Sequence, residues 1–195
     1  MYVYDIESWG LNASAYAFSA AIEINSGEEF VFRDPQMARS HFEENAPCIV
    51  YAHNSFGFDL FSILNIEEAY QARKIASGTN IYEIRHQGVK YRDSKHLFPL
   101  KLSQLGDSFN MPKGETPIDF IEANVREIND LDIEYCLRDC RILARAIIEL
   151  HDFYAERMGK TRHETALPLT IASISYRIWC ESSWPEHWGW IDKKS

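Results

Sequence analysis

The sequence has little that would place the protein in a membrane or in an oxidising compartment. It contains no run of about 18 apolar residues, so we expect no segment to span a bilayer. Its N-terminus, Met1–Asp5, lacks the basic start and apolar middle of a signal peptide. Its few cysteines have neither a secreted-domain spacing nor a paired C-x-x-C zinc pattern: Cys48, Cys136, Cys140 and Cys180. We therefore expect a reduced, cytoplasmic protein.

Basic residues are also scarce. Lys and Arg total 20 against 29 Asp and Glu, a net charge of −9, which argues against a protein that coats nucleic acid by charge alone. An enzyme that holds a strand end through bound cations remains possible, because cations invert the local electrostatics. The hydrophobic share of 46% and charged share of 25% exclude disorder, collagen and coiled coil as the main architecture. A chain of 195 residues predicts one compact domain with at most an appendage.

Hydrophobic patterning predicts an α/β domain. Strands are expected over residues 2–7, 15–24, 28–33, 48–52, 80–86 and 88–93. Helices are expected from an Asp34 N-cap to about 45, and over about 58–69, 101–109, 130–158 and 167–182. Two Pro and one Gly favour a loop over 110–121. The order of elements indicates a mixed central sheet flanked by helices.

The first strand ends in two carboxylates, Asp5 and Glu7. The two-residue period of a strand puts both side chains on one face, where they repel unless a cation lies between them. The pair indicates a metal site. The alternative is an ordinary acidic pair on an exposed strand.

A second polar cluster, residues 53–59, directly follows the buried strand at 48–52. Open α/β sheets bind ligands at the carboxyl ends of their strands, so His53 and Asp59 are candidates for a site. The alternatives are that Asp59 only caps the next helix and that His53 only binds backbone.

A third cluster, Tyr135 and Asp139, lies on one face of the long helix because the spacing is i, i+4. A carboxylate beside the apolar stretch at Leu137 and Leu143 is costly unless it is paired or bound to metal. The alternative is an exposed Asp that pairs with a nearby Arg.

Taken together and in this order, the three clusters resemble a known enzyme pattern. D-I-E on the first strand, N-x3-F-D after a later strand and Y-x3-D on a late helix resemble the DEDDy 3′–5′ exonucleases. The segments "YDIES", "HNSFGFD" and "YCLRDC" resemble the proofreading exonuclease domain of family B DNA polymerases over about residues 1–155. The resemblance implies a ribonuclease H-like exonuclease fold, with a DEDDy domain over 1–160.

A narrower resemblance is to protein-primed polymerases of bacteriophages and linear plasmids, which would put the protein in a host-cell cytoplasm. Those carry a Lys-Gly-acidic element between the second and third motifs, as Lys113-Gly114-Glu115 does here, and Ser94 stands where they place a strand-contacting Ser. The alternative is that Lys113 is an ordinary loop lysine in solvent.

The sequence also departs from that family. No S-L-Y-P-S or Y-x-D-T-D-like polymerase element is present, so we expect an excised domain, a split polymerase subunit or a free-standing exonuclease. Residues 161–195 are expected to form a C-terminal helix and a Trp-rich extension packed on the exonuclease domain. The extension would be a cap or would dock a partner through Trp184, Trp188 and Trp190.

The resemblance implies metal-dependent hydrolysis of single-stranded DNA from its 3′ end to nucleoside monophosphates. Two divalent ions, Mg²⁺ or Mn²⁺, would be held by Asp5, Glu7, Asp59 and Asp139. Tyr135 would orient the attacking water through its hydroxyl, since a Tyr with a pKa of about 10 is a poor base. Lys113 would offset charge at the scissile phosphate.

The same resemblance implies contacts to the terminal nucleotides from Ser8, His53, Asn54, Phe58 and Ser94. Phe58 would stack on a base or belong to the core. Expected partners are a DNA 3′ end and a polymerase domain or subunit. The alternative functions are a ribonuclease of the same fold and a non-catalytic module that holds DNA ends or a polymerase partner.

Overall fold

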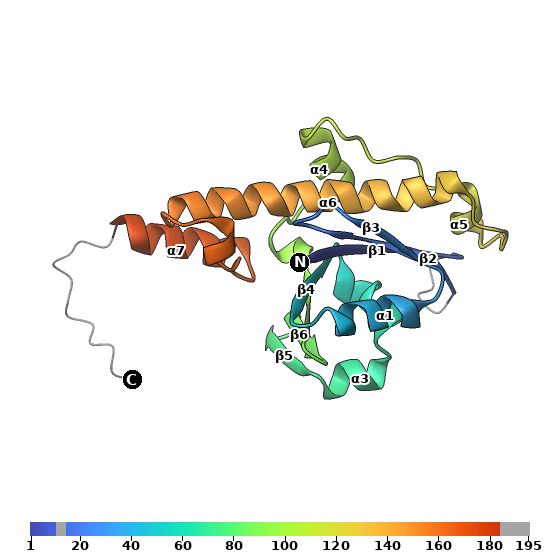
Figure 1. The fold of residues 1–195 in the computed structure, drawn as a ribbon, viewed down its shortest axis with the longest axis horizontal. Coiled ribbons are helices and arrows are strands. Elements are labelled where there is room, and N and C mark those ends of the chain that lie inside the picture. The colour runs from blue at the N-terminus through green and yellow to red at the C-terminus, as the bar shows by residue number, and fades with distance from the viewer. Residues whose placement is uncertain (11–14, 184–195) are drawn as a thin grey trace.

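A seven-stranded mixed sheet forms the centre of the computed structural model, which describes residues 1–10 and 15–183 (Figure 1). Its order is β3-β2-β1-β4-β7-β6-β5. The strands are β1 (Tyr2–Ser8), β2 (Tyr16–Glu23), β3 (Glu29–Phe32), β4 (Cys48–Ala52), β5 (Arg73–Ser77), β6 (Asn80–His86) and β7 (Val89–Asp93). The β1–β4 and β4–β7 pairs are parallel and the others antiparallel. The predicted α/β class with a mixed sheet is confirmed.

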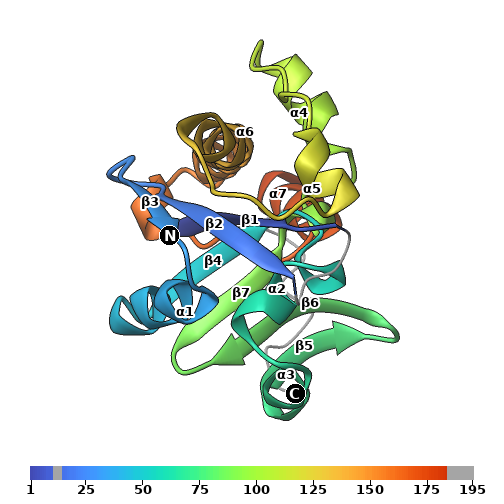
Figure 2. The same ribbon diagram turned by 90° about the vertical axis from the view of Figure 1, so that its right-hand side faces the viewer.

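Helices cover both faces of this sheet. The long helix α6 (Asp130–Arg157) crosses one face, and α1 (Pro35–Glu44) lies on the opposite face (Figure 2). The remaining helices are α2 (Leu60–Ile63), α3 (Ile66–Gln71), α4 (Leu102–Ser108), α5 (Ile118–Glu122), α7 (Ile171–Ser183) and the short 3-10 turns Ser55–Gly57, Ser94–His96 and Arg162–Glu164. None of the helices within 1–10 and 15–183 is long and apolar enough to cross a membrane.

The side-chain alternation of β1 decides which layer each of its residues meets. Val3 is buried in the cluster that includes the α6 side chains, whereas Tyr4 is buried in the cluster that includes α1. Because side chains two residues apart share a face, Asp5 and Glu7 continue the Val3 row beneath α6. The same periodicity that builds the core therefore carries two carboxylates under the long helix.

Four details differ from the sequence prediction. The predicted helix over 58–69 is two helices, α2 and α3, because Asn65 and Glu68 form a capping box that begins a new helix. The strand β5 was not predicted. The predicted loop over 110–121 contains α5, and the last helix begins at Ile171 instead of about 167. Trp184, Trp188 and Trp190 lie outside the described residues.

The segment after α6 is tied to the sheet by a buried ion pair. Glu83 accepts a 2.7 Å bond from Arg92 Nε, and Arg92 Nη1 donates to the hydroxyl of Tyr51 and to the carbonyl oxygen of Leu167. Leu167 and Ile174 are buried in the α6-side core. The described part of the C-terminal segment therefore shares its core with the sheet.

Gly106 allows a tight return of the chain between α4 and the loop that leads to Lys113. The Met111 N–H donates to the Gly106 carbonyl oxygen at 2.8 Å. A Cβ atom on Gly106 would overlap the Met111 carbonyl oxygen and lie 3.0 Å from Ile142 Cδ1. Only glycine at position 106 therefore allows the backbone of Met111 to lie this close.

We predict that Gly106→Ala lowers the free energy of unfolding by about 1–3 kcal/mol, because backbone and a packed core side chain must both move. Asp107→Ala is the control, since Asp107 is exposed in the same helix. Denaturant unfolding followed by circular dichroism measures both. Equal stability of the two variants would contradict the steric account.

Candidate active site

The carboxyl ends of the parallel strands β1, β4 and β7 meet at one edge of the sheet, where α/β proteins bind ligands. Asp5 and Glu7 lie late in β1. The segment that contains Asn54 and Asp59 follows β4, and β7 ends at Asp93. The long helix α6 lies across the sheet above β1 (Figure 2). Groups far apart in the sequence are thereby collected in one place.

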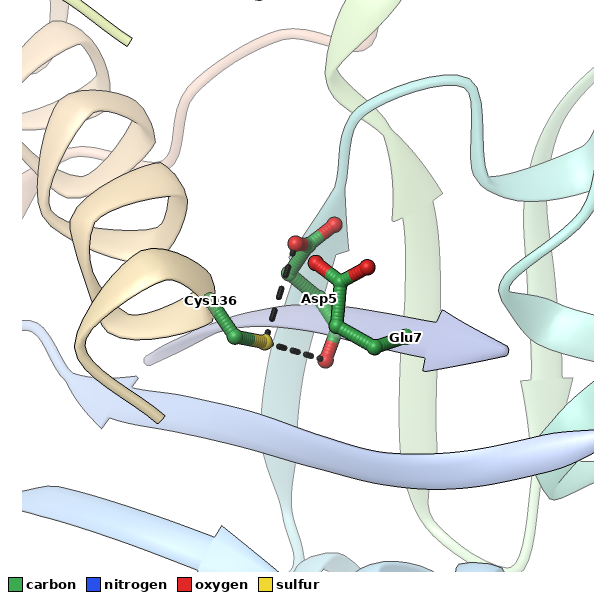
Figure 3. A group of neighbouring side chains, drawn as sticks. All are labelled: Asp5, Glu7 and Cys136. Carbon is green, nitrogen blue, oxygen red and sulfur yellow. Dashed lines mark hydrogen bonds between the residues drawn. The ribbon is translucent and has the colours of Figure 1, made fainter. Parts of the chain in front are cut away.

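Asp5 and Glu7 project from the same face of β1 with their carboxylates beside each other (Figure 3). Asp5, Glu7 and Cys136 each offer a donor atom, and these atoms all lie within 4.8 Å of one another. Burial, followed by the charge of Asp139, raises the pKa of Asp5 to about 7. Burial, followed by the charge of Asp5, raises the pKa of Glu7 to about 9. A pair of anions held this way favours a proton or a cation.

Asp59 is 5% exposed and stands at the N-cap position, directly before α2. It makes no side-chain capping bond to that helix, so the capping alternative receives no support. Burial, followed by the charges of Asp5 and Asp93, raises its pKa well above the usual value. Asp59 therefore belongs electrostatically to the same acidic group as Asp5.

Asp139 is 2% exposed and pairs with Lys113, so it is not the exposed Arg-paired Asp of the alternative. The Lys113 ammonium donates to Asp139 Oδ2, while Oδ1 is buried without a hydrogen-bond partner. Burial raises the pKa of Asp139 and Lys113 opposes this shift. Burial alone would lower the pKa of Lys113, but the charge of Asp139 holds it above the ordinary value. The pair leaves one carboxylate oxygen free for another ligand.

Tyr135 lies beneath the loop that contains Lys113. Its hydroxyl is 2.8 Å from Thr116 Oγ1, and the Lys113 ammonium lies 5.3 Å from its ring centre. A Cβ atom on Gly114 would be 3.2 Å from the ring, so glycine lets the loop lie against it. Burial raises the pKa of Tyr135, which keeps the hydroxyl protonated at neutrality.

His53 and Asn54 are tied to the end of β7 by side-chain bonds. His53 Nε2 donates to the Leu100 carbonyl oxygen at 2.9 Å, and Nδ1 is 2.9 Å from Ser94 Oγ. Burial lowers the pKa of His53, so the ring is neutral and Nδ1 accepts a hydrogen bond from the Ser94 hydroxyl. Asn54 Oδ1 accepts a 3.0 Å bond from Lys95 Nζ. His53 therefore binds backbone, as the alternative for this residue expected, and its contact to a nucleotide stays a prediction.

Ser8 and Phe58 have structural partners of their own. Ser8 Oγ donates to the Gly10 carbonyl oxygen at 2.7 Å. Phe58 is partly buried and packs against the α1-side core. Both lie next to site carboxylates in the sequence, but contacts to DNA from either side chain stay predictions.

An open groove of about 660 Å³ begins at His53 and Asn54 and continues along the segment after β7. Its cationic or titratable lining residues include Lys95, His96 and Lys101. In a chain with a net charge of −9, this is a local concentration of basic groups. The groove shares His53 and Asn54 with the end of β4, and the carboxylate of Asp93 also lines it.

The sequence prediction did not single out two residues of this region. Asp93 Oδ1 accepts the backbone N–H groups of Asn54 and Lys95, both at 2.9 Å, and so joins the ends of β4 and β7. Thr116 holds the Tyr135 hydroxyl. A further residue without a predicted role in the site is Cys136, whose thiol faces Asp5. An Asp-Ser pair at a strand end is the only sequence signal for Asp93.

The residues present fit divalent cations. Carboxylate oxygens are the donors that Mg²⁺ and Mn²⁺ prefer, and the buried, unpartnered Asp139 Oδ1 is a donor without a protein partner. Burial and mutual repulsion raise the pKa values of Asp5, Glu7 and Asp59, so a bound cation would stabilise their charged forms. The acidic group is thus a possible metal site.

No protein-family model matches the chain, and no curated protein is significantly similar in sequence. Solved structures do match. Phi29 DNA polymerase with primer-template DNA and incoming nucleotide superposes with a TM-score of 0.70 at 14% identity, over 93% of this chain and 34% of that one. Phi29 DNA polymerase with single-stranded DNA gives 0.68 at 14% identity, over the same 93% and 34%. The family B DNA polymerase of the archaeon Pyrobaculum calidifontis gives 0.56 at 16% identity, over 89% of this chain and 26% of that one.

The chain therefore spans about a third of the phi29 DNA polymerase chains that it matches. At this identity the likeness concerns the fold. The predicted resemblance to family B DNA polymerases is confirmed at the level of the fold: the described chain has the mixed-sheet α/β fold of a part of these polymerases.

Proposed function

We propose that the protein is a metal-dependent 3′–5′ exonuclease that hydrolyses single-stranded DNA ends to nucleoside monophosphates. The observation that carries this proposal is the group of four buried or nearly buried carboxylates, Asp5, Glu7, Asp59 and Asp139, whose charges act on one another at one sheet edge. Residues 1–160 would form the exonuclease domain, and residues 161–195 an extension packed on it.

Two bound Mg²⁺ or Mn²⁺ ions would supply an activated water and stabilise the attacking and leaving oxygens of an in-line displacement. Asp5, Glu7, Asp59 and Asp139 would hold them. The burial that makes this group costly without cations also makes it a tight binding site with them, because opposite charges attract more strongly where water is excluded. The protein contributes a fixed arrangement that needs no reorganisation during the reaction.

Lys113 would act on the substrate phosphate. Its ammonium neutralises part of the acidic group through Asp139 and lies beside Tyr135 at the rim of the site. A protonated amine there can approach a scissile phosphate and offset the charge that develops on it. Its raised pKa keeps it charged at every pH at which the enzyme would work.

Tyr135 would position the attacking water. Its hydroxyl stays protonated and is held by Thr116, so it donates or accepts one hydrogen bond in a fixed direction. Such a group orients a water molecule without removing its proton.

The basic groove supports single-stranded DNA as the substrate class. Lys95 and Lys101 line it, and a backbone-directed contact would read no sequence. The neighbouring phi29 structures contain single-stranded DNA and primer-template DNA. Comparing matched 5′-labelled DNA and RNA strands tests the substrate: equal or faster loss of RNA would instead favour a ribonuclease of the same fold.

We predict that Asp5→Ala with Glu7→Ala abolishes the metal-dependent shortening of a 5′-labelled DNA strand and leaves the protein folded, because removal of two repelling anions relieves strain in the metal-free site. Circular dichroism checks the fold. Glu44→Ala serves as the control, since Glu44 is exposed at the end of α1. Full activity of the double variant would disprove the site, and a wild type inactive with Mg²⁺ and Mn²⁺ would favour a non-catalytic module.

The metal-free protein should lose stability as pH rises. The folded pKa values of Asp5, about 7, and Glu7, about 9, exceed the ordinary values of 3.8 and 4.5, so the folded state binds more protons than the unfolded state in this range. From about pH 7 to about pH 9 the unfolding free energy of wild type should fall by on the order of 1–3 kcal/mol relative to Asp5→Asn/Glu7→Gln. Calorimetry with a chelator measures this, and parallel pH profiles of the two proteins would contradict it.

Tyr135→Phe should keep the fold and metal binding but slow hydrolysis by about 1–3 kcal/mol of barrier, because one oriented hydrogen bond is lost. Thr116→Val is the companion variant: it leaves the Tyr135 hydroxyl in place without its partner. Its rate should fall between those of wild type and Tyr135→Phe in single-turnover assays. A wild-type rate for Tyr135→Phe would leave Tyr135 a core residue.

Lys113→Ala and Lys113→Arg should each lower the turnover rate roughly 10-fold or more, about 1.4 kcal/mol, and change binding of a strand end much less. The reason is that the contact strengthens only as charge develops on the phosphate. Lys160→Ala is the control, because Lys160 is exposed beyond the end of α6. Single-turnover rates at saturating Mg²⁺ decide, and wild-type rates for both variants would make Lys113 a loop residue.

A further inference from the structure

A thiol faces the carboxylates of β1. Cys136 is 0% exposed, and its Sγ lies 3.8 Å from Asp5 Oδ2 and 3.6 Å from the Asp5 carbonyl oxygen (Figure 3). Donor atoms of Asp5, Glu7 and Cys136 all lie within 4.8 Å of one another. Two hard oxygen donors and one soft sulfur donor therefore point at the same small volume.

The neighbouring thiol of Cys140 is not one of the three donor atoms. Cys140 follows Cys136 by one helical turn and is equally buried, but its Sγ lies 3.5 Å from the carbonyl oxygen of Ala20. Packing alone explains Cys140. Cys136 also belongs to the α6-side apolar core, but its thiol differs from that of Cys140 in lying beside a carboxylate.

We propose that Asp5, Glu7 and Cys136 form a binding site for a thiophilic divalent cation of the zinc class. Zinc takes thiolate at about 2.3 Å and carboxylate at about 2.0–2.2 Å in a tetrahedron, which requires ligand atoms roughly 3.5 Å apart. Sγ and Asp5 Oδ2 are 3.8 Å apart and the three donor atoms lie within 4.8 Å of one another, so metal binding would draw them closer together. Mg²⁺ prefers oxygen ligands and does not bind sulfur well, so the thiol favours a zinc-class ion over Mg²⁺ at this site.

A second observation also points to a cation here. Asp139 lies one turn along α6 from Cys136, is 2% exposed, and has a carboxylate oxygen without a hydrogen-bond partner. Its charge acts on both Asp5 and Glu7. The site is thus acidic beyond its three donors, and the fourth position of the cation is left for a water molecule.

The consequence for activity rests on the proposed function. A zinc-class ion on Asp5 and Glu7 occupies two of the proposed magnesium ligands, so it inhibits the exonuclease. Binding exchanges the Cys136 thiol proton, which passes to solvent, for a metal–sulfur bond, and no oxidation occurs. Inhibition should therefore depend on a residue that magnesium-supported hydrolysis does not need as a ligand.

Cobalt(II) titration of the metal-free protein tests the site without any assay of activity. In a Cys48→Ser/Cys180→Ser background, wild-type Cys136 should give a thiolate-to-cobalt charge-transfer band that Zn²⁺ abolishes by displacement. Cys136→Ala and Cys136→Ser should lose the band, and Cys140→Ala should keep it. Asp5→Asn/Glu7→Gln, with both thiols intact, should bind cobalt at least 10-fold more weakly, which covers the case of an unfolded Cys136 variant.

A band that survives Cys136→Ala, or that disappears only in Cys140→Ala, overturns the proposal, as does the absence of a band when cobalt binds. Inhibition by zinc is measured in a separate experiment. The Zn²⁺ concentration that halves the rate of the Mg²⁺-supported reaction should be at least 10-fold higher for Cys136→Ser than for wild type, with each protein compared with its own zinc-free rate. If the proposed function is wrong, no Mg²⁺-supported reaction is observed. The cobalt band still tests the thiol site in that case, because it does not depend on activity.

Discussion

Mutual repulsion among buried carboxylates is the interaction on which the rest of the site depends. Asp5, Glu7, Asp59 and Asp139 are brought within electrostatic reach of one another, and Lys113 supplies a cation that pairs directly with Asp139. Separate burial of each acid would cost several kcal/mol. The fold tolerates the group because the strands and α6 fix these positions with a large apolar core on either side.

The architecture explains how such a group arises from few sequence features. A single strand, β1, alternates between the two cores, so its odd positions face α6 and place Val3, Asp5 and Glu7 in one row. The parallel pairing of β4 with β1 brings the following turn to the same edge. Helix α6 then spans the row, so its residues at i and i+4 meet the strand from above. The loop to Lys113 reaches this point because Gly106 and Gly114 permit close backbone approach.

Local rules predicted part of this arrangement from the sequence. The shared face of Asp5 and Glu7 follows from the strand period, and the shared face of Tyr135 and Asp139 from the helix period. The meeting of these pairs with Asp59 did not follow from either period, since it depends on strand order, and only the family resemblance anticipated it. The roles of Thr116 and Asp93 depend on loop paths and on the β4–β7 pairing, which no local pattern encodes. Strand β5 was not predicted because Arg73–Ser77 lacks the alternation of apolar and polar residues that marks a strand. It is an edge strand and pairs only with β6. The break at Asn65 had a readable signal, an N-x-x-E capping box, within an otherwise helical pattern.

Anomalous diffraction from crystals soaked in Mn²⁺ tests the central claim most directly, because it locates cations without reference to activity. The account predicts two anomalous peaks about 3.5–4 Å apart, coordinated by Asp5, Glu7, Asp59 and Asp139, with one of them bound by the Asp139 oxygen that has no partner in the metal-free protein. Peaks confined to other carboxylates, or none at manganese concentrations that saturate ordinary two-metal nucleases, would contradict the assignment of this acidic group as a catalytic metal centre.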